Sequence, residues 1–241
     1  MDSIDWNTAM EVLANSSLFG GLQPNMVRSM AGKLKVERWP RHKVVVRPHE
    51  PVNRLYLLIN GRVKVAQHNP CSGRALTFFV HGPGAVFGLE SLLDARLGGA
   101  STETLDHVTA LSGPHELWNG WAGSLPAFRD AARRYTARHM HTLAELAGDL
   151  ALHDTMTRLA RLFVRYFGGG GDAAAGAECL IGNLPDEELA FMIGSVRVVV
   201  NRLLAALKRQ GVLDRRDGTW RVLDFETLLR IAQWYGAAGA G

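Results

Sequence analysis

The segment from 184 to 224, LPDEELAFMIGSVRVVVNRLLAALKRQGVLDRRDGTWRVLD, restricts the fold more than any other part of this 241-residue chain. A first helix is predicted over 186–193, because a proline precedes it and acids occupy its first turn, where the helix dipole favours them. Gly194 separates it from a second helix, predicted from about 196 to 209. Asp-Gly at 217–218 predicts the tight turn of a β-hairpin. The segment therefore predicts a helix-turn-helix followed by a hairpin wing.

The second of these helices has one apolar face and one cationic face. Val200, Leu203, Leu204 and Leu207 recur at i, i+3, i+4 and i+7, which is the pattern of a single buried face. The helix carries four cations and no acid, and a helix of this kind enters the major groove in helix-turn-helix proteins. The alternative is an ordinary amphipathic pair with a solvated basic face. The residues predicted to contact DNA are Ser195, Arg197, Val198, Asn201, Arg202, Lys208 and Arg209.

The N-terminal half is predicted to form β-structure after short helices in residues 1–35. From about 36 to 120, short apolar runs alternate with Gly, Pro and Asn, which is typical of a sandwich or roll rather than of alternating α/β units. Asn60-Gly61, between LYLLI and RVKVA, is the strongest hairpin signal in the chain. The predicted class is α+β, with an N-terminal β-roll and a C-terminal winged helix-turn-helix.

A long helix is predicted between these two parts. Ser124 and Pro126 suit a helix start, and no further proline occurs before Pro185. A helix from 125 to about 152 exceeds the usual length of ~10–14 residues, and such helices often pack against a second subunit. Alternating spacings of four and three predict the dimer seam along His139, Leu143, Leu146, Leu150 and His153. The predicted divisions are 1–123 for the sensor, 124–154 for the dimerisation helix and hinge, and 155–241 for the DNA-binding domain.

Composition predicts a globular cytoplasmic protein. Apolar residues make up 47% of the chain, but no stretch approaches the ~18 apolar residues of a membrane span. The first residues are acidic and lack the basic start of a secretory signal. Cys71 and Cys179 are far apart and too few for a disulfide framework or an iron–sulfur cluster, so each is expected as a free thiol. No membrane partner is expected.

The residue patterns favour a binding protein over an enzyme. A cupin-like metal site needs paired histidines on a strand, but the only H-x-H, His139-Met140-His141, lies in the predicted long helix. No nucleophile elbow, carboxylate pair or zinc-ligand spacing occurs either. No catalytic or metal site is therefore predicted. A β-roll enzyme and a regulatory nucleotide-binding module without DNA binding are the alternatives.

The order of these features resembles the Crp/Fnr superfamily of transcription regulators. The resemblance is carried by YLLINGRVKV, the PGAVFG turn, the long helix and the helix-turn-helix, and it spans nearly the whole chain. It implies a homodimer on palindromic double-stranded DNA that contacts RNA polymerase, with Arg197 reading a guanine and Asp154 as a hinge acid. It also implies control by a signal sensed in the roll. The effector pocket that it implies comprises Phe87, Gly88, Leu89, Glu90, Ser91, Ser101, Thr102, Leu143 and Leu146.

Departures from the cyclic-AMP branch of that family concern the effector and the half-site. Ala100 stands where the branch has its phosphate-binding arginine, and a buried phosphate without a cation is costly, so cyclic AMP is not expected in the usual pocket. The cofactor stays unknown: nine histidines, His81 among them, leave haem open, and Cys71 leaves a redox thiol open. Val198 replaces the family's usual Glu and predicts contact with a thymine methyl.

Overall fold

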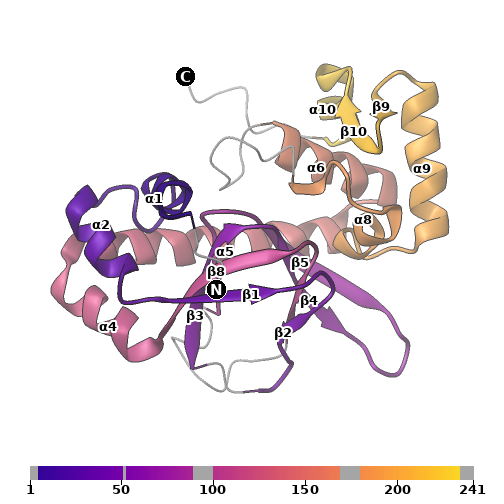
Figure 1. Cartoon of the computed structure of the whole chain (residues 1–241). Coiled ribbons are helices and arrows are strands. Elements are labelled where there is room, and N and C mark those ends of the chain that lie inside the picture. Colours follow the sequence, from indigo (N-terminus) through magenta and orange to yellow (C-terminus); the bar gives the residue numbers. More distant parts are fainter. Residues whose placement is uncertain (1–4, 51–52, 89–99, 169–179, 234–241) are drawn as a thin grey trace. The chain divides into compact units, whose positions relative to one another are not determined.

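The computed structural model describes residues 5–50, 53–88, 100–168 and 180–233, and Figure 1 shows their elements along the chain. These residues form two compact units. The first contains residues 5–50, 53–67, 79–88 and 100–143, and the second contains residues 68–78, 144–168 and 180–233. The change from the first unit to the second therefore falls inside the long helix.

The first unit is built around two antiparallel sheets, and Figure 1 labels β1 to β5 and β8 among their strands. One sheet has the strand order β1-β8-β3-β6 and the other β2-β7-β4-β5. The strands are β1 (Lys35–Trp39), β2 (Val44–Val46), β3 (Arg54–Asn60), β4 (Val63–His68), β5 (Ala75–His81), β6 (Val86–Phe87), β7 (Ser101–Thr104) and β8 (Val108–Pro114). The helices are α1 (Trp6–Ala14), α2 (Pro24–Ala31) and α4 (His115–Ser124), followed by the long helix. The predicted N-terminal roll is confirmed.

The turn at Asn60-Gly61 differs from the prediction. β3 and β4, the strands that flank it, belong to different sheets, so they do not form a hairpin. Gly61 has φ of +80°, but Asn60 is not among the residues with positive φ, whereas a type I′ turn needs both. A Cβ at Gly61 would lie 2.4 Å from the carbonyl oxygen of His107. The glycine is therefore required by this close approach, where the chain passes from one sheet to the other.

Aromatic rings fill the core of the first unit. Trp118 is 1% exposed, and its ring packs edge-on against Phe19 and Trp121, with centroids 6.0 and 5.2 Å apart. Tyr135 is fully buried, and its hydroxyl donates to the carbonyl of Val86 at 2.8 Å and accepts from the amide of the same residue at 2.9 Å. Trp118 and Trp121 are thus structural, and Tyr135 fastens the long helix to the roll.

The long helix, α5, runs from Pro126 to Leu152 and ends close to the predicted boundary. Asp154 follows it as the N-cap of α6 (Thr155–Phe167), and its carboxylate accepts from the amide of Thr157 at 2.8 Å. This hydrogen bond lowers the pKa of Asp154. A capping aspartate starts a new helix and satisfies an amide that would otherwise lack a partner.

The second unit contains the predicted helix-turn-helix and wing. Its further elements are α8 (Asp186–Met192), α9 (Arg197–Arg209), β9 (Leu213–Arg216), β10 (Thr219–Val222) and α10 (Phe225–Ile231). Gly194 has φ of +61°, and a Cβ there would lie 2.6 Å from a methyl group of Leu150. Asp217 and Gly218 both have positive φ, which confirms the tight turn between β9 and β10.

Among the described residues, no single helix is long and apolar enough to cross a membrane; α8 and α9 satisfy that test only as a pair, across a bend of 102°.

Candidate nucleic-acid interface

Helix α9 buries one face and exposes the other, as its sequence predicts. Val200 and Leu207 are 0% exposed and Leu204 is 2% exposed, so this row anchors the helix in the core of its unit. On the opposite side, Val198 is 80% exposed, and Val196, the N-cap residue before the helix, is 53% exposed. The side chain of Val198 is therefore largely available to a ligand, which makes it a candidate for contact with one.

The cations of α9 differ in what surrounds them. Arg197, Arg202 and Arg209 are exposed, and no carboxylate in the described part of the chain lies within ion-pairing distance of them. Lys208, in contrast, is 2.9 Å from Asp214 of β9. Hydrogen bonds from Lys208 and Arg216 hold the pKa of Asp214 at about 2. The uncompensated positive charge of the helix therefore lies on its three arginines.

Two of the predicted contact residues also bond within the chain. The amide of Ser195 donates to the carbonyl of Ala190 at 2.9 Å, which closes the turn between α8 and α9. Asn201 is exposed, but its side-chain amide reaches Asp186 of α8, and its hydrogen-bond partners assign the nitrogen to the side that faces this carboxylate. Neither bond appears in a helical-wheel analysis, because both partners lie on the preceding helix.

The wing adds further cations beside α9. Arg216 and Arg221 are exposed on the hairpin, whereas Trp220 is 5% exposed and packs edge-on against Phe163 of α6, with ring centroids 6.3 Å apart. The amide of Trp220 donates to the carbonyl of Gly182 at 2.7 Å. Trp220 therefore anchors the hairpin, and the arginines around it are displayed at the surface.

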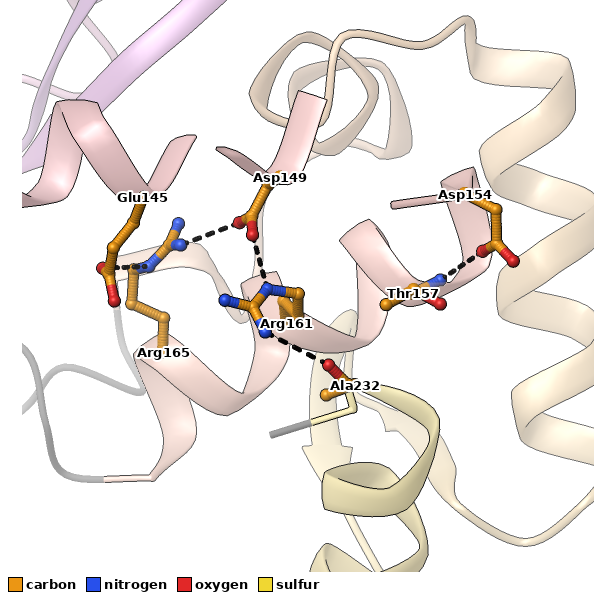
Figure 2. Close-up of polar contacts among 7 residues, drawn as sticks. All are labelled: Glu145, Asp149, Asp154, Thr157, Arg161, Arg165 and Ala232. Carbon is orange, nitrogen blue, oxygen red and sulfur yellow. Dashed lines mark hydrogen bonds and ion pairs between the residues drawn. The ribbon is translucent and has the colours of Figure 1, made fainter. Parts of the chain in front are cut away.

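A buried ionic cluster joins the end of α5 to α6, and Figure 2 shows it. Asp149 is 5% exposed and accepts hydrogen bonds from Arg161 and, at 2.9 Å, from Arg165. Arg165 also pairs with Glu145 at 3.7 Å, and Arg161 donates to the carbonyl of Ala232 at 3.3 Å. This Asp149 cluster ties α5, α6 and the end of α10 together. Sequence analysis missed it, although the four-residue spacing of the two arginines puts them on one face of α6.

The residues predicted for the dimer seam mostly face their own chain. His139 packs against Phe79, His81 and Tyr135, with ring centroids 4.3–5.4 Å apart, and Leu146 is 8% exposed. Leu150 lies against Gly194, and His153 is half-buried. Leu143 alone among the five is exposed, at 41%. The seam stays a prediction, although these four positions are at least partly buried within their own chain.

The exposed side of α5 has its own regular pattern. Its positions alternate by three and four residues, which is the spacing of a helix-packing seam. This exposed stripe comprises Ala137, Met140, Ala144, Ala147 and Ala151, with Met140 exposed by 67%. Leu143 and Leu152, exposed by 41% and 79%, flank it.

The described part of the predicted effector pocket is largely buried. Phe87 is 2%, Ser101 7% and Thr102 4% exposed, and the Ser101 hydroxyl donates to the carbonyl of Ala66 at 3.2 Å. Gly88 has φ of +85°. Leu89, Glu90 and Ser91 lie outside the described residues. The pocket thus stays a prediction, and the described residues contain no group of three or more potential metal ligands.

Imidazole and aromatic rings also form a small cluster in the first unit. The rings of His81 and Phe79 stack with centroids 5.3 Å apart, and the His139 ring lies 5.4 Å from that of His81. Burial and the neighbouring imidazole of His139 lower the pKa of His81 to about 3. The side chain is therefore uncharged at neutral pH.

Comparisons with known families match both halves of the chain. Residues 36–122 match a family model described as a cyclic nucleotide-binding domain, and residues 157–231 match one described as a Crp-like helix-turn-helix domain. Together with the fold, this pairing decides the family. The chain belongs to the Crp/Fnr family of transcription regulators.

Similar proteins share this architecture over most of their length. A CRP-like cAMP-activated global transcriptional regulator of Mycobacterium tuberculosis is 28% identical over 92% of this chain and 99% of its own. The cyclic AMP receptor protein of Thermus thermophilus is 26% identical over 91% of this chain and 98% of its own. A CooA variant from Carboxydothermus hydrogenoformans superposes with a TM-score of 0.71 at 20% identity, covering 85% of this chain and 90% of that one. The predicted class of transcription regulator, with a DNA-binding helix-turn-helix, is confirmed.

Proposed function

We propose that this Crp/Fnr-type regulator is a cytoplasmic homodimer that binds a palindromic DNA site and contacts RNA polymerase there. The observation that carries the DNA-reading part is the exposed, acid-free face of α9. Arg197, Val198 and Arg202 lie at the surface of a helix whose other face is buried in its unit. A helix inserted in the major groove reads base edges with its N-terminal residues and phosphates with the rest.

Arginines at the two ends of α9 separate base reading from phosphate binding. Arg197 begins the helix and is assigned to a guanine, whereas Arg209 ends it and is assigned to a phosphate. Arg197→Ala should weaken binding to the selected site by roughly 5- to 150-fold and relax the preference at one base pair. Arg209→Ala should weaken binding to every sequence about equally and reduce the salt slope by about 0.9. Binding isotherms over a range of salt concentrations distinguish the two, and equal effects of both variants would refute the assignment.

Val198 is assigned to the choice of half-site. Its side chain is 80% exposed, and an apolar side chain in the major groove contacts the methyl group of thymine. Selection from random DNA should give a half-site with a thymine that Val198→Glu no longer prefers, because a carboxylate accepts from cytosine instead. The same half-site for both proteins, or the TGTGA-type half-site for the natural one, would contradict this role.

Dimerisation is assigned to the exposed stripe of α5. Alanines allow two helix backbones to approach closely, and Met140 with Leu143 supplies apolar area on the same side. Met140→Asp should therefore shift the protein toward monomers in sedimentation velocity measurements. Leu223→Asp is the control, because Leu223 is similarly exposed, at 54%, but lies after β10. Equal dissociation by both substitutions, or by neither, would contradict the assignment.

DNA binding is controlled by a signal sensed in the roll. That signal is not cyclic AMP bound in the usual pocket. Ala100 provides no cation at the position assigned to a buried phosphate. Titration calorimetry should therefore detect no tight binding of cyclic AMP, and Ala100→Arg should strengthen whatever binding occurs. Tight binding of cyclic AMP to the natural protein would refute this part while leaving the DNA assignment unaffected. Native mass spectrometry of the purified dimer would reveal haem or another bound effector by its mass.

A further inference from the structure

One carboxylate joins the three elements that surround the proposed DNA-binding face. Asp186 is the first residue of α8, and its Oδ1 accepts from a guanidinium nitrogen of Arg215, on β9 of the wing, at 3.1 Å. With the Asn201 amide oriented as its hydrogen-bond partners require, its nitrogen on α9 donates to Oδ2 of Asp186 at 2.9 Å. That same amide nitrogen lies 3.2 Å from the carbonyl of Arg197. Asp186 thus connects the first helix, the recognition helix and the wing.

The Arg215 guanidinium is held from several sides. It lies over the ring of Trp220, with Cζ 5.2 Å from the ring centroid, and its Nε donates to the carbonyl of Gly218 at 3.1 Å. Because Trp220 is itself buried, the ring is a fixed platform for the cation. A guanidinium with a stacked face, a carboxylate and a carbonyl partner differs from Arg216 and Arg221, which stand at the surface of the same hairpin.

We propose that Asp186 is a positioning residue that determines sequence specificity. Its carboxylate compensates the charge of Arg215 and keeps the amide of Asn201 turned toward α8. The inference rests on the proposed DNA-reading function. Arg197, Val198 and Arg202 then read the bases. The affinity for unrelated DNA is lower than it would be if Arg215 were also free to bind a phosphate. Each cation that is free to reach a phosphate strengthens binding to any sequence and steepens its salt dependence.

The competing explanation is that Asp186 only stabilises α8. An acid at a helix N-terminus interacts favourably with the helix dipole. Glu187 and Glu188 occupy the same first turn, however, so α8 keeps two acids when Asp186 is replaced. Glu187 is exposed, and no ion pair involving it is found among the described residues. Glu187→Gln therefore removes the same charge from the same turn without changing the contacts of Arg215 or Asn201.

The experiment compares Asp186→Asn with Glu187→Gln in the full-length protein. Affinity for the selected site and for a scrambled duplex is measured by fluorescence anisotropy over a series of salt concentrations. For Asp186→Asn, we expect the preference for the selected site to fall by at least about threefold. The salt slope on scrambled DNA should become steeper by about 0.9, the contribution of one phosphate contact. Glu187→Gln should leave both quantities close to those of the natural protein.

A second variant tests whether the released arginine is the cause. Adding Arg215→Met to Asp186→Asn keeps an apolar side chain over Trp220 but removes the charge, so the slope should return to its original value. A slope that stays high in the double variant, or Asp186→Asn behaving like Glu187→Gln, would overturn the proposal. Equal weakening on both duplexes, with an earlier thermal unfolding transition, would show a merely structural role. If the natural protein itself prefers no sequence, the proposed function fails instead.

Discussion

Two polar groups, one in each unit, are stabilised away from water in opposite ways. In the first unit, His81 is uncharged and packs against the rings of Phe79 and His139. In the second, Asp149 is nearly inaccessible to solvent and is charge-compensated by Arg161 and Arg165. A buried ion pair is sensitive to the loss of one partner, because the remaining charge stays buried without compensation. A neutral imidazole is instead sensitive to the gain of a proton. The comparison therefore predicts different weaknesses for the two units.

The largest effect is expected at the Asp149 cluster. Asp149→Ala leaves two guanidinium groups without their shared carboxylate, and breaking a buried pair costs about 3–5 kcal/mol of unfolding free energy. The lower end, about 3 kcal/mol, is expected, because Arg161 keeps the Ala232 carbonyl and Arg165 keeps Glu145. Urea unfolding at a fixed protein concentration measures it. The more exposed Glu145 is the control. A Glu145→Gln variant as unstable as Asp149→Ala would contradict the claim that the burial of Asp149 makes its loss costly.

The second effect concerns acidification of the first unit. The pKa of His81 is about 3 in the folded chain and about 6.5 when unfolded, so between these values the unfolded chain binds a proton that the folded chain excludes. Stability from this group is complete above pH 6.5 and falls as the pH decreases, by up to about 1.4 kcal/mol per pH unit. At pH 5 the expected loss is about 2 kcal/mol by the same slope. His81→Phe should remove this part of the pH dependence; an unchanged profile would show that His81 does not cause it.

A smaller effect is expected where a carboxylate caps a helix at the surface. Asp154 is exposed and accepts from the Thr157 amide, so Asp154→Ala removes a cap but leaves no buried charge. Such substitutions cost about 1 kcal/mol. Asp154→Asn is the matched control, because asparagine caps nearly as well, and chemical denaturation of both variants gives the difference. If alanine and asparagine gave the same stability, the cap would not be what Asp154 contributes.

The local parts of the fold were predictable from sequence, and the pairings between distant segments were not. Asp217-Gly218 and Asn60-Gly61 give the same turn signal, but only the first joins paired strands. Its strands have no neighbours in the described chain other than each other, so the turn alone decides their pairing. At Gly61 the pairing is decided by β7 and β8, which begin about forty or more residues later. The flanking strands each pair with one of these rather than with each other.

In the candidate site too, the features set by local sequence pattern were predictable, and those set by tertiary contacts were not. The period of α9 correctly separates Val200 and Leu207 from Val198. The helical period of apolar residues could not distinguish the exposed side of α5 from its buried side. Alanines fill the exposed stripe, whereas the side that packs against the rest of the chain carries histidine and leucine. The ties of Asn201 to Asp186 and of Arg161 to Asp149 join residues from different helices. Helical periodicity reports which side of a helix is apolar, but not which polar groups a neighbouring helix brings within reach.

The smallest effect is expected at Asp214, and it sharpens the comparison with Asp149. Both carboxylates have two cationic partners, since Asp214 pairs with Lys208 and with Arg216 at 3.1 Å. Hydrogen bonds from these partners hold the pKa of Asp214 at about 2, so its stabilising effect is present above pH 4 and is lost as the pH falls through 2. Lys208 is 53% and Arg216 62% exposed, however, so water screens these pairs.

Asp214→Asn should therefore leave the urea midpoint at pH 7 unchanged within error. It should also free Lys208 for phosphate and steepen the salt dependence of DNA binding, because the cation then lacks its intramolecular partner. A loss of stability comparable to that of Asp149→Ala would show that the number of partners, rather than burial, determines what a carboxylate contributes.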